Sequence, residues 1–403
     1  MRDLTSQLGV YLDHVVQRID ADEILEGPVV GASQVVNADV PSVTAIAALP
    51  RRPLWTFVAV AVTVLVIGIF PSLLPGSQER PEPAVDLGVF EPLQGRIVVV
   101  NGKELEGFDP ADPTSSVILE IPDLPPVPDE VCGFSPTPCD DGADSLMPVG
   151  WSRDGTVLAL ESEYAGVSYL MDDTGTPARI PWEEVGTEMG CCGFVTSNWL
   201  SPDEGYAARA SGLDLAIIDL ENIRVESKAE LDPDEFPGHE GYGQIYSQTW
   251  SPDGAQVAFV AVAFEDRRES PTIQIYNRAT GTVQALSGST FGHIRNLAWS
   301  PDGSQLLVVA GDLVLRAGLS LNPLTQPIST SLYLLDVDDG GSRRIASGHY
   351  VAVAWSPDDS QIAAIDYYTG HDLVVMDADG TDQQTLARMD ASLFTGVSWH
   401  PAP

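Results

Sequence analysis

Two short stretches gather the side chains that could bind a ligand or a cation. Residues 231–245 place carboxylates beside a histidine and a tyrosine, and residues 265–270 carry both acidic and basic groups. Clustered carboxylates suit hard cations such as Ca²⁺, although the first stretch lacks the ligand spacing of an EF-hand. Isolated loop charges are more often simply solvated. The candidate binding residues are Asp232, Asp234, Glu235, His239, Tyr242, Glu265, Asp266, Arg267 and Arg268.

Four cysteines form a second group with its own chemistry: Cys132, Cys139, Cys191 and Cys192. Their spacing, with two adjacent cysteines, is unlike the usual ligand spacing of a zinc site. Disulfides are therefore the favoured interpretation. A local Cys132–Cys139 bridge and cross-pairing with Cys191 or Cys192 both remain open, because sequence alone does not select the connectivity.

No catalytic motif accompanies these groups. The sequence contains no G-x-S-x-G elbow, HExxH pair, P-loop or dinucleotide fingerprint. The six histidines are scattered along the chain. We therefore predict a protein without enzymatic activity and without a cofactor, with Ca²⁺ at residues 231–245 as the one ion that the chemistry would allow.

The charge balance restricts the partners. The chain of 403 residues has a formal net charge of −38, and 44% of its residues are hydrophobic. Such a chain can bury a large core, and its acidic surface repels nucleic-acid phosphates and anionic lipid headgroups. We expect no nucleic-acid partner.

One segment predicts a membrane anchor. Residues 54–74 contain no charged side chain and are long enough to cross a bilayer as a helix. Arg51 and Arg52 precede this segment, and acidic residues follow it, so the positive-inside rule predicts a cytoplasmic N-terminus. We expect a single-pass protein of the cell membrane whose later residues, including the cysteines, lie outside, where disulfides persist.

The segments that flank the predicted anchor are short. Residues 1–53 contain one amphipathic pattern at helical spacing, within residues 1–26, and a single helix needs a partner to cover its apolar face. A cytoplasmic regulator is the partner we expect there. Residues 75–94 are rich in proline and glutamate and predict an extended linker.

A repeated phrase fills the remainder of the chain, residues 95–403. WSPDG begins at Trp250 and Trp299, and close variants of this phrase begin at four other tryptophans. The copies recur about every 50 residues, and each is followed by three runs of strand-like residues, a pattern typical of propeller blades. In each copy Pro-Asp-Gly suits a tight turn, and the tryptophan can pack between blades. The repeat tryptophans are Trp151, Trp199, Trp250, Trp299, Trp355 and Trp399.

The phrase WSPDG with a later DADG turn at Asp377 resembles the TolB-type propeller repeat, a distant cousin of WD repeats. The resemblance implies an all-β fold, a six-bladed β-propeller of four-stranded blades. We expect one transmembrane helix and a short N-terminal helical segment to precede it, as the first 74 residues predict. We predict that residues 396–401 supply the innermost strand of the blade that begins at residue 96, because such closure removes the open sheet edges. Cutting the chain before Thr395 should then unfold or oligomerise the domain.

Alternating strand directions sort the loops onto two faces of the predicted propeller. One face carries only short turns, such as PDG and DADG, and the other carries every long insertion, including residues 231–245, 265–270 and both cysteine-bearing loops. Long loops on a rigid scaffold commonly bind partners. We therefore expect an extracytoplasmic protein, peptide or glycan partner on the long-loop face. The alternatives are a metal-dependent propeller hydrolase or lactonase and a passive envelope scaffold.

Overall fold

The structure, a computed structural model, describes residues 86–126, 146–162, 167–185, 198–232, 244–265, 268–286, 291–311, 329–367, 371–389 and 396–401. All of these belong to the second of two compact units, Pro81–Pro403. The predicted N-terminal helix and membrane anchor lie outside the described residues. Within the described ranges, no helix has the length and apolar character that crossing a membrane requires.

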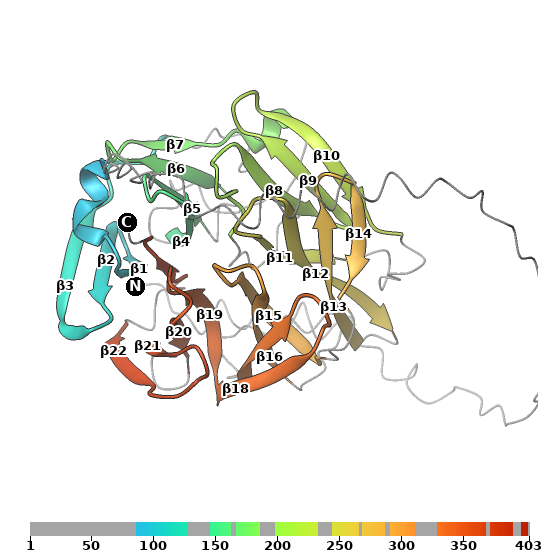
Figure 1. The fold of residues 1–403 in the computed structure, drawn as a ribbon. Helices are drawn as coiled ribbons and strands as arrows, with labels where there is room; N and C mark the ends of the chain where they lie inside the picture. Colours follow the sequence, from blue (N-terminus) through green and yellow to red (C-terminus); the bar gives the residue numbers. More distant parts are fainter. Residues whose placement is uncertain are drawn as a thin grey trace, which may run out of the picture. The chain divides into compact units, whose positions relative to one another are not determined.

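The described chain forms six antiparallel sheets around a common axis, which confirms the predicted six-bladed propeller (Figure 1). Blade 1 combines β23 (Ser398–Trp399), β1 (Ile97–Asn101), β2 (Glu104–Asp109) and β3 (Asp112–Glu120). Blade 2 contains β4 (Leu146–Trp151), β5 (Val157–Ser162), β6 (Ser168–Asp172) and β7 (Pro177–Arg179), and blade 3 contains β8 (Tyr206–Ser211), β9 (Asp214–Asp219) and β10 (Arg224–Glu230). Blade 4 contains β11 (Gln244–Trp250), β12 (Gln256–Glu265), β13 (Arg268–Asn277) and β14 (Thr282–Ala285). Blade 5 contains β15 (His293–Trp299), β16 (Gln305–Gly311), β17 (Thr330–Asp336) and β18 (Ser342–Gly348). Blade 6 contains β19 (Tyr350–Trp355), β20 (Gln361–Asp366), β21 (Asp372–Asp377) and β22 (Gln384–Arg388).

Blade 3 has its innermost strand in reduced form. A single antiparallel bridge joins Leu200 to Ala207 beside β8. The bridge lies next to Trp199, which is where the other blades have their innermost strand. The four-strand plan therefore holds in all six blades.

Burial differs between the strands of a blade, which explains their composition. The second strand of blade 5, β16, is buried at six of its seven positions and consists mainly of leucine and valine. The outermost strand of blade 3, β10, alternates between exposed residues and half-buried or buried ones. Second strands are covered on both faces by neighbouring blades and so need apolar residues, whereas outermost strands meet water.

The blades are joined into a ring by β23. Trp399 pairs with Ile97 and Ser398 with Val98, so the last described strand completes the first blade. The N–H of His400 donates to the carbonyl of Arg96 at 2.9 Å, which extends the connection by one residue. The predicted closure of the ring is confirmed.

The folded region begins before residue 95, within the stretch expected to be linker. Residues Gly88–Leu93 form the 3₁₀ helix η2. Phe90 and Leu93 are fully buried and belong to the core between blades 1 and 2. A second 3₁₀ helix, η4 (Trp182–Val185), follows β7.

Residues 265–270 differ from the expected long loop. The strands β12 and β13 are each ten residues long and pair as far as Glu265 with Arg268, so only Asp266 and Arg267 separate them. The expectation was wrong because the apolar run before Glu265 continues into an extended hairpin, in which Glu265 and Arg268 are strand residues.

Ring closure can be tested by truncating the full chain before Thr395. We expect loss of the cooperative thermal transition, or oligomers in light scattering, because β1 loses its only inner neighbour and exposes a strand edge. Removing only residues 402–403 is the matched control, since it keeps the pairs made by Ser398 and Trp399. A monomeric truncation as stable as the control would contradict the closure.

Candidate functional site

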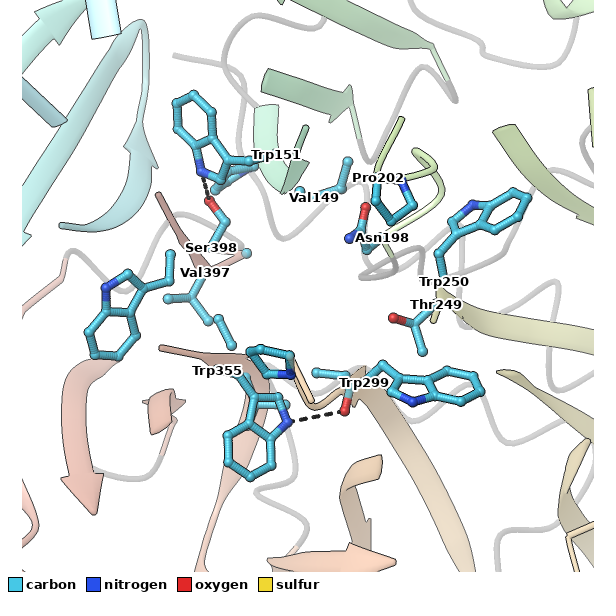
Figure 2. Close-up of a pocket in the computed structure, with 18 of the residues that line it drawn as sticks. Val149, Trp151, Asn198, Pro202, Thr249, Trp250, Trp299, Trp355, Val397 and Ser398 are labelled. Atoms are coloured by element: carbon cyan, nitrogen blue, oxygen red, sulfur yellow. Dashed lines mark hydrogen bonds between the residues drawn. The ribbon is translucent and has the colours of Figure 1, made fainter. Parts of the chain in front are cut away.

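A central channel runs between the innermost strands. It holds a cavity of ≈ 260 Å³ to which all six blades contribute lining residues (Figure 2). Val149, Asn198, Thr249 and Val397 surround the open centre of the view, and the ring tryptophans lie farther out. Most of the lining is apolar, so the channel offers an apolar surface with a few polar positions.

The tryptophans of the repeated phrase hold neighbouring blades together and so position this lining. The indole N–H of Trp151 donates to Ser398 Oγ in blade 1 at 3.0 Å, and that of Trp355 donates to the carbonyl of Ala298 in blade 5 at 3.3 Å. Trp250 likewise donates to the carbonyl of Trp199 in blade 3 at 2.9 Å. All six repeat tryptophans are buried.

The Ser-x-Asp part of the phrase makes the same turn in five blades. In blade 5 the hydroxyl of Ser300 donates to Asp302 Oδ1 at 2.7 Å and accepts the N–H of Gln305 at 2.9 Å. The N–H of Gly303 donates to the carbonyl of Ser300 at 2.9 Å, which closes a four-residue turn. The same serine-to-aspartate bond recurs at Asp154, Asp203, Asp253 and Asp358.

These aspartates are held as turn residues, and their pKa values reflect it. The N–H of Ser304 and the hydroxyl of Ser300 hold the pKa of Asp302 below its usual value. The hydroxyls of Ser360 and Ser356 have the same effect on the pKa of Asp358. Carboxylates that are already bonded in this way are poor candidates for metal ligands or general acids.

The position that follows Asp in the turn has a left-handed backbone. Gly303 has φ +78°, but Glu204 and Asp359 occupy the same place with φ +59° and +61°. Glycine adopts this region without steric cost, which is why three copies of the phrase carry it.

One end of the channel is rimmed by the residues that precede these five aspartates and by Pro401, which holds the matching position in blade 1. Five of the six are prolines, Pro202, Pro252, Pro301, Pro357 and Pro401, and the sixth is Arg153. Arg153 is the only charged side chain among the described residues that line the cavity. Its guanidinium donates to the carbonyl of Pro252, two blades away, and its N–H donates to the carbonyl of Pro202 at 3.0 Å. The rim is therefore apolar, with one cation reaching across it.

A buried ion pair joins blades 2 and 3. Arg209 Nη1 lies 3.1 Å from Glu161 Oε1, and both side chains are almost fully buried. The guanidinium also lies 4.5 Å from the centre of the Trp182 ring. Burial raises the pKa of Glu161, and the charge of Arg209 opposes that rise. The pair has no opening to the cavity, and we assign it to blade packing.

The structure describes three of the predicted binding residues. Asp232 lies at the start of its loop, and Glu265 and Arg268 are paired in the backbone register of a hairpin. The remaining candidates lie outside the described residues: Asp234, Glu235, His239, Tyr242, Asp266 and Arg267. The four cysteines lie outside them as well, so both disulfide arrangements stay predictions.

The expected Ca²⁺ site also falls mostly outside the described residues. In the ranges that are described, no group of three or more histidine, cysteine, aspartate or glutamate side chains is placed to hold a metal ion.

The sequence analysis missed the channel lining and its rim. A signal was present for the rim, because Arg153 is the one non-proline at its position in the repeat. The buried pair of Glu161 and Arg209 carried no such signal, since it depends on contact between two blades.

One family profile and several solved structures match parts of this chain. The profile of the WD domain, G-beta repeat, matches residues 282–316, which include β14, β15 and β16. The chain is a six-bladed β-propeller, one segment of which matches this profile. TolB from Acinetobacter baumannii is 17% identical, with a TM-score of 0.48 over 77% of this chain and 67% of that chain. A chain of the nidogen/laminin complex is 11% identical, with a TM-score of 0.47 over 76% of this chain and 98% of that chain. No curated protein sequence matches the chain.

The aspartates of the Ser-x-Asp turns make the free energy of unfolding depend on pH. The pKa values of Asp253, Asp302 and Asp358 are lowered in the folded protein. Their stabilising effect is therefore full above the unfolded value of about 3.9 and is lost as the pH falls through the lower folded values. We expect the free energy of unfolding, measured in urea, to fall as the pH drops below about 4.

Ser300→Ala should lower that free energy by about 1–2 kcal/mol at pH 7, because it removes a bonded hydroxyl and leaves the Gln305 N–H without its acceptor. The loss should be smaller near pH 3, where Asp302 is partly protonated. Ser342→Ala, at an exposed position of β18, is the control and should change stability by less than about 0.5 kcal/mol. Equal losses at both pH values would rule out the coupling between Ser300 and the Asp302 charge.

Proposed function

We propose that this propeller is a binding protein whose partner, a protein or peptide, inserts an anchor into the central channel. The observation that carries the proposal is the cavity lined by the inner strands of all six blades. A rigid, preformed and largely apolar hollow is the common form of a binding site.

The size of the cavity favours an anchor over a whole small ligand. Its ≈ 260 Å³ is below the range of roughly 300–1,000 Å³ typical of sites that enclose a drug-sized molecule. A partner that places one or two side chains in such a pocket, and rests the remainder of its surface on the rim, uses it as an interaction hot spot.

The lining also favours a protein over a sugar. Val149, Val353 and Val397 present aliphatic surface, and prolines form most of the rim. Polar positions such as Asn198 and Thr249 are few (Figure 2). Aliphatic or aromatic side chains of a protein complement this surface better than the hydroxyl groups of a glycan do.

The chemistry of the lining supports binding rather than hydrolysis. Among the described residues that line the cavity there is no histidine, cysteine, aspartate or glutamate. General acid–base catalysis and metal ligation both draw mainly on those residue types. The hydrolase or lactonase alternative therefore has less support than a binding role.

Filling the channel should abolish capture of the partner. Ala354 lines the cavity and is half-buried, so Ala354→Phe would place a ring in the space that the anchor needs. We expect the partner recovered with the full chain from native membranes to fall by about tenfold or more, since loss of a hot-spot contact costs 2 kcal/mol or more. Quantitative mass spectrometry of the captured proteins is the measurement.

Ala285→Phe is the matched control, because Ala285 is exposed on the outer strand β14. Ala298→Phe, at a second position in the cavity lining, guards against a folding defect confined to Ala354. Thermal unfolding of each variant reports such defects. An identical set of captured proteins for the wild type and both channel variants would refute binding in the channel.

We further propose that the propeller is anchored in the cell membrane by residues 54–74, with residues 1–26 in the cytoplasm. The uncharged length of residues 54–74 and the arginines before it support this arrangement. Carbonate extraction should leave the full chain in the membrane fraction, and deletion of residues 54–74 should release it.

The cytoplasmic segment is proposed to contact a regulator. A version that lacks residues 1–50 should lose a cytoplasmic protein that the full chain retains, while envelope partners stay bound. If both versions retain the same proteins, the N-terminal segment does not signal, and only the propeller carries the function.

A further inference from the structure

Arg295, on β15 of blade 5, is a half-buried cation without an acidic partner. No ion pair or hydrogen bond joins its side chain to another described residue, whereas four other arginines of the propeller are paired. Arg209, Arg224, Arg278 and Arg388 each lie within 3.1 Å of a carboxylate oxygen. The chain has 58 acidic residues for 20 lysines and arginines, so an arginine without an acidic neighbour is unexpected on composition alone.

The backbone places Arg295 at the channel. The pairing of β15 with β16 is interrupted by a bulge between Ile294 and Asn296, and Arg295 is the extra residue in that bulge. The next residues along the strand, Asn296, Leu297 and Ala298, line the cavity. Arg295 therefore lies one residue beyond the cavity lining, toward the long-loop face, at the end opposite Arg153.

Two tyrosines from the adjacent blades interact electrostatically with the guanidinium. Tyr246, on β11 of blade 4, donates its hydroxyl to the carbonyl of Ile294 at 3.0 Å, which holds it beside Arg295. Tyr367 follows β20 of blade 6, and its N–H donates to the carbonyl of His349 at 3.1 Å. Burial lowers the pKa of Arg295, and the phenol groups of Tyr367 and Tyr246 oppose that effect. Phenols carry no charge at neutral pH, so they do not neutralise the arginine.

Asp366 is the carboxylate adjacent to Tyr367 in the sequence, and it interacts with groups other than Arg295. Asp366 precedes Tyr367, but its charge acts on Tyr350, whose pKa is raised to about 12 chiefly by burial. A Cβ added to Gly348 would meet Asp366 Oδ2 at 3.2 Å, which places this carboxylate against Gly348. Asp366 therefore lies against Gly348, and no ion pair joins it to Arg295 in the described part of the chain.

We propose that Arg295 binds a carboxylate of the partner at the long-loop end of the channel. This inference rests on the proposed function, because it assigns a charge to the anchor that enters the channel. A guanidinium binds a carboxylate through two parallel hydrogen bonds, and a site shielded from water strengthens both. The carboxylate belongs either to an acidic side chain or to a chain end of the partner.

Small probes test the site without the partner. N-acetylvaline presents a chain-end carboxylate, glutaric acid monoamide presents a side-chain carboxylate, and N-acetylvalinamide is the neutral counterpart of the first. Saturation-transfer NMR on the full chain gives a dissociation constant for each. We expect at least one carboxylate probe to bind, and the neutral amide to bind about tenfold or more weakly. The tighter of the two carboxylates identifies the source.

Arg295→Gln should weaken binding of the carboxylate probe by about tenfold or more and leave the affinity for the neutral amide unchanged. Arg344→Gln is the matched control, since it removes the same charge from an exposed position on β18. Its probe affinities should equal those of the wild type. Equal binding of acid and amide, or equal losses in both variants, would overturn the site.

A structural role for Arg295 predicts a different result for stability. Removing a half-buried cation that lacks a partner should leave the melting temperature at or above that of the wild type. A clear fall in melting temperature for Arg295→Gln would overturn the proposal, since it would mean that the arginine is already satisfied within the fold. Arg209→Gln provides the contrast. It leaves the buried carboxylate of Glu161 without its ion-pair partner and should lower the melting temperature.

The proposed function can survive the failure of this site. If Ala354→Phe abolishes capture of the partner while Arg295→Gln does not, the channel binds the partner and the carboxylate contact is wrong. If neither variant affects capture but Arg295→Gln abolishes binding of the probe, the anion site stands and binding of the partner in the channel is wrong.

Discussion

Closure of the ring by β23 is the contact on which the remaining architecture depends. A channel lined from six directions exists only if the last blade meets the first, and that meeting involves two residue pairs. Neighbouring contacts reinforce them. The indole of Trp151 donates to Ser398, and the ring of His400 packs 4.4 Å from the ring of Trp151. Burial lowers the pKa of His400, so its ring is neutral at neutral pH and fits the apolar joint between blades 1 and 2.

Repetition explains the scaffold, and departures from repetition mark the candidate site. Each blade needs a buried tryptophan against its neighbour and a tight turn, so those residues recur. The rim position and the bulged residue of the inner strand are two places where single blades depart from this repetition. Arg153 replaces a proline at the first, and Arg295 occupies the second where β4 and β19 carry valines. Cations at these two positions support the proposal that an anionic group enters the channel.

The sequence predicted what the repeats determine. The spacing of Trp250, Trp299 and Trp355 was sufficient for blades, and the lone strand at Trp399 was sufficient for closure. It did not predict the extended hairpin at Glu265 and Arg268, because a charged run was interpreted as a loop although cross-strand pairing accommodates it. It did not predict Arg295 either. Its neighbours Tyr246 and Tyr367 are far away in the chain, and only the ring brings them together.

The two arginines give the ends of the channel a positive charge, opposite in sign to the net charge of the protein. Arg153 lies at the short-turn rim and Arg295 beyond the other end, in a chain whose net charge is −38. Low-dielectric walls concentrate the field of a charge along a channel, so these cations act mainly on groups that enter it. An acidic protein surface would be repelled by the exterior before reaching them. Specificity is a difference between affinities, and a partner bound as proposed needs a neutral or basic surface that brings its carboxylate within an apolar anchor.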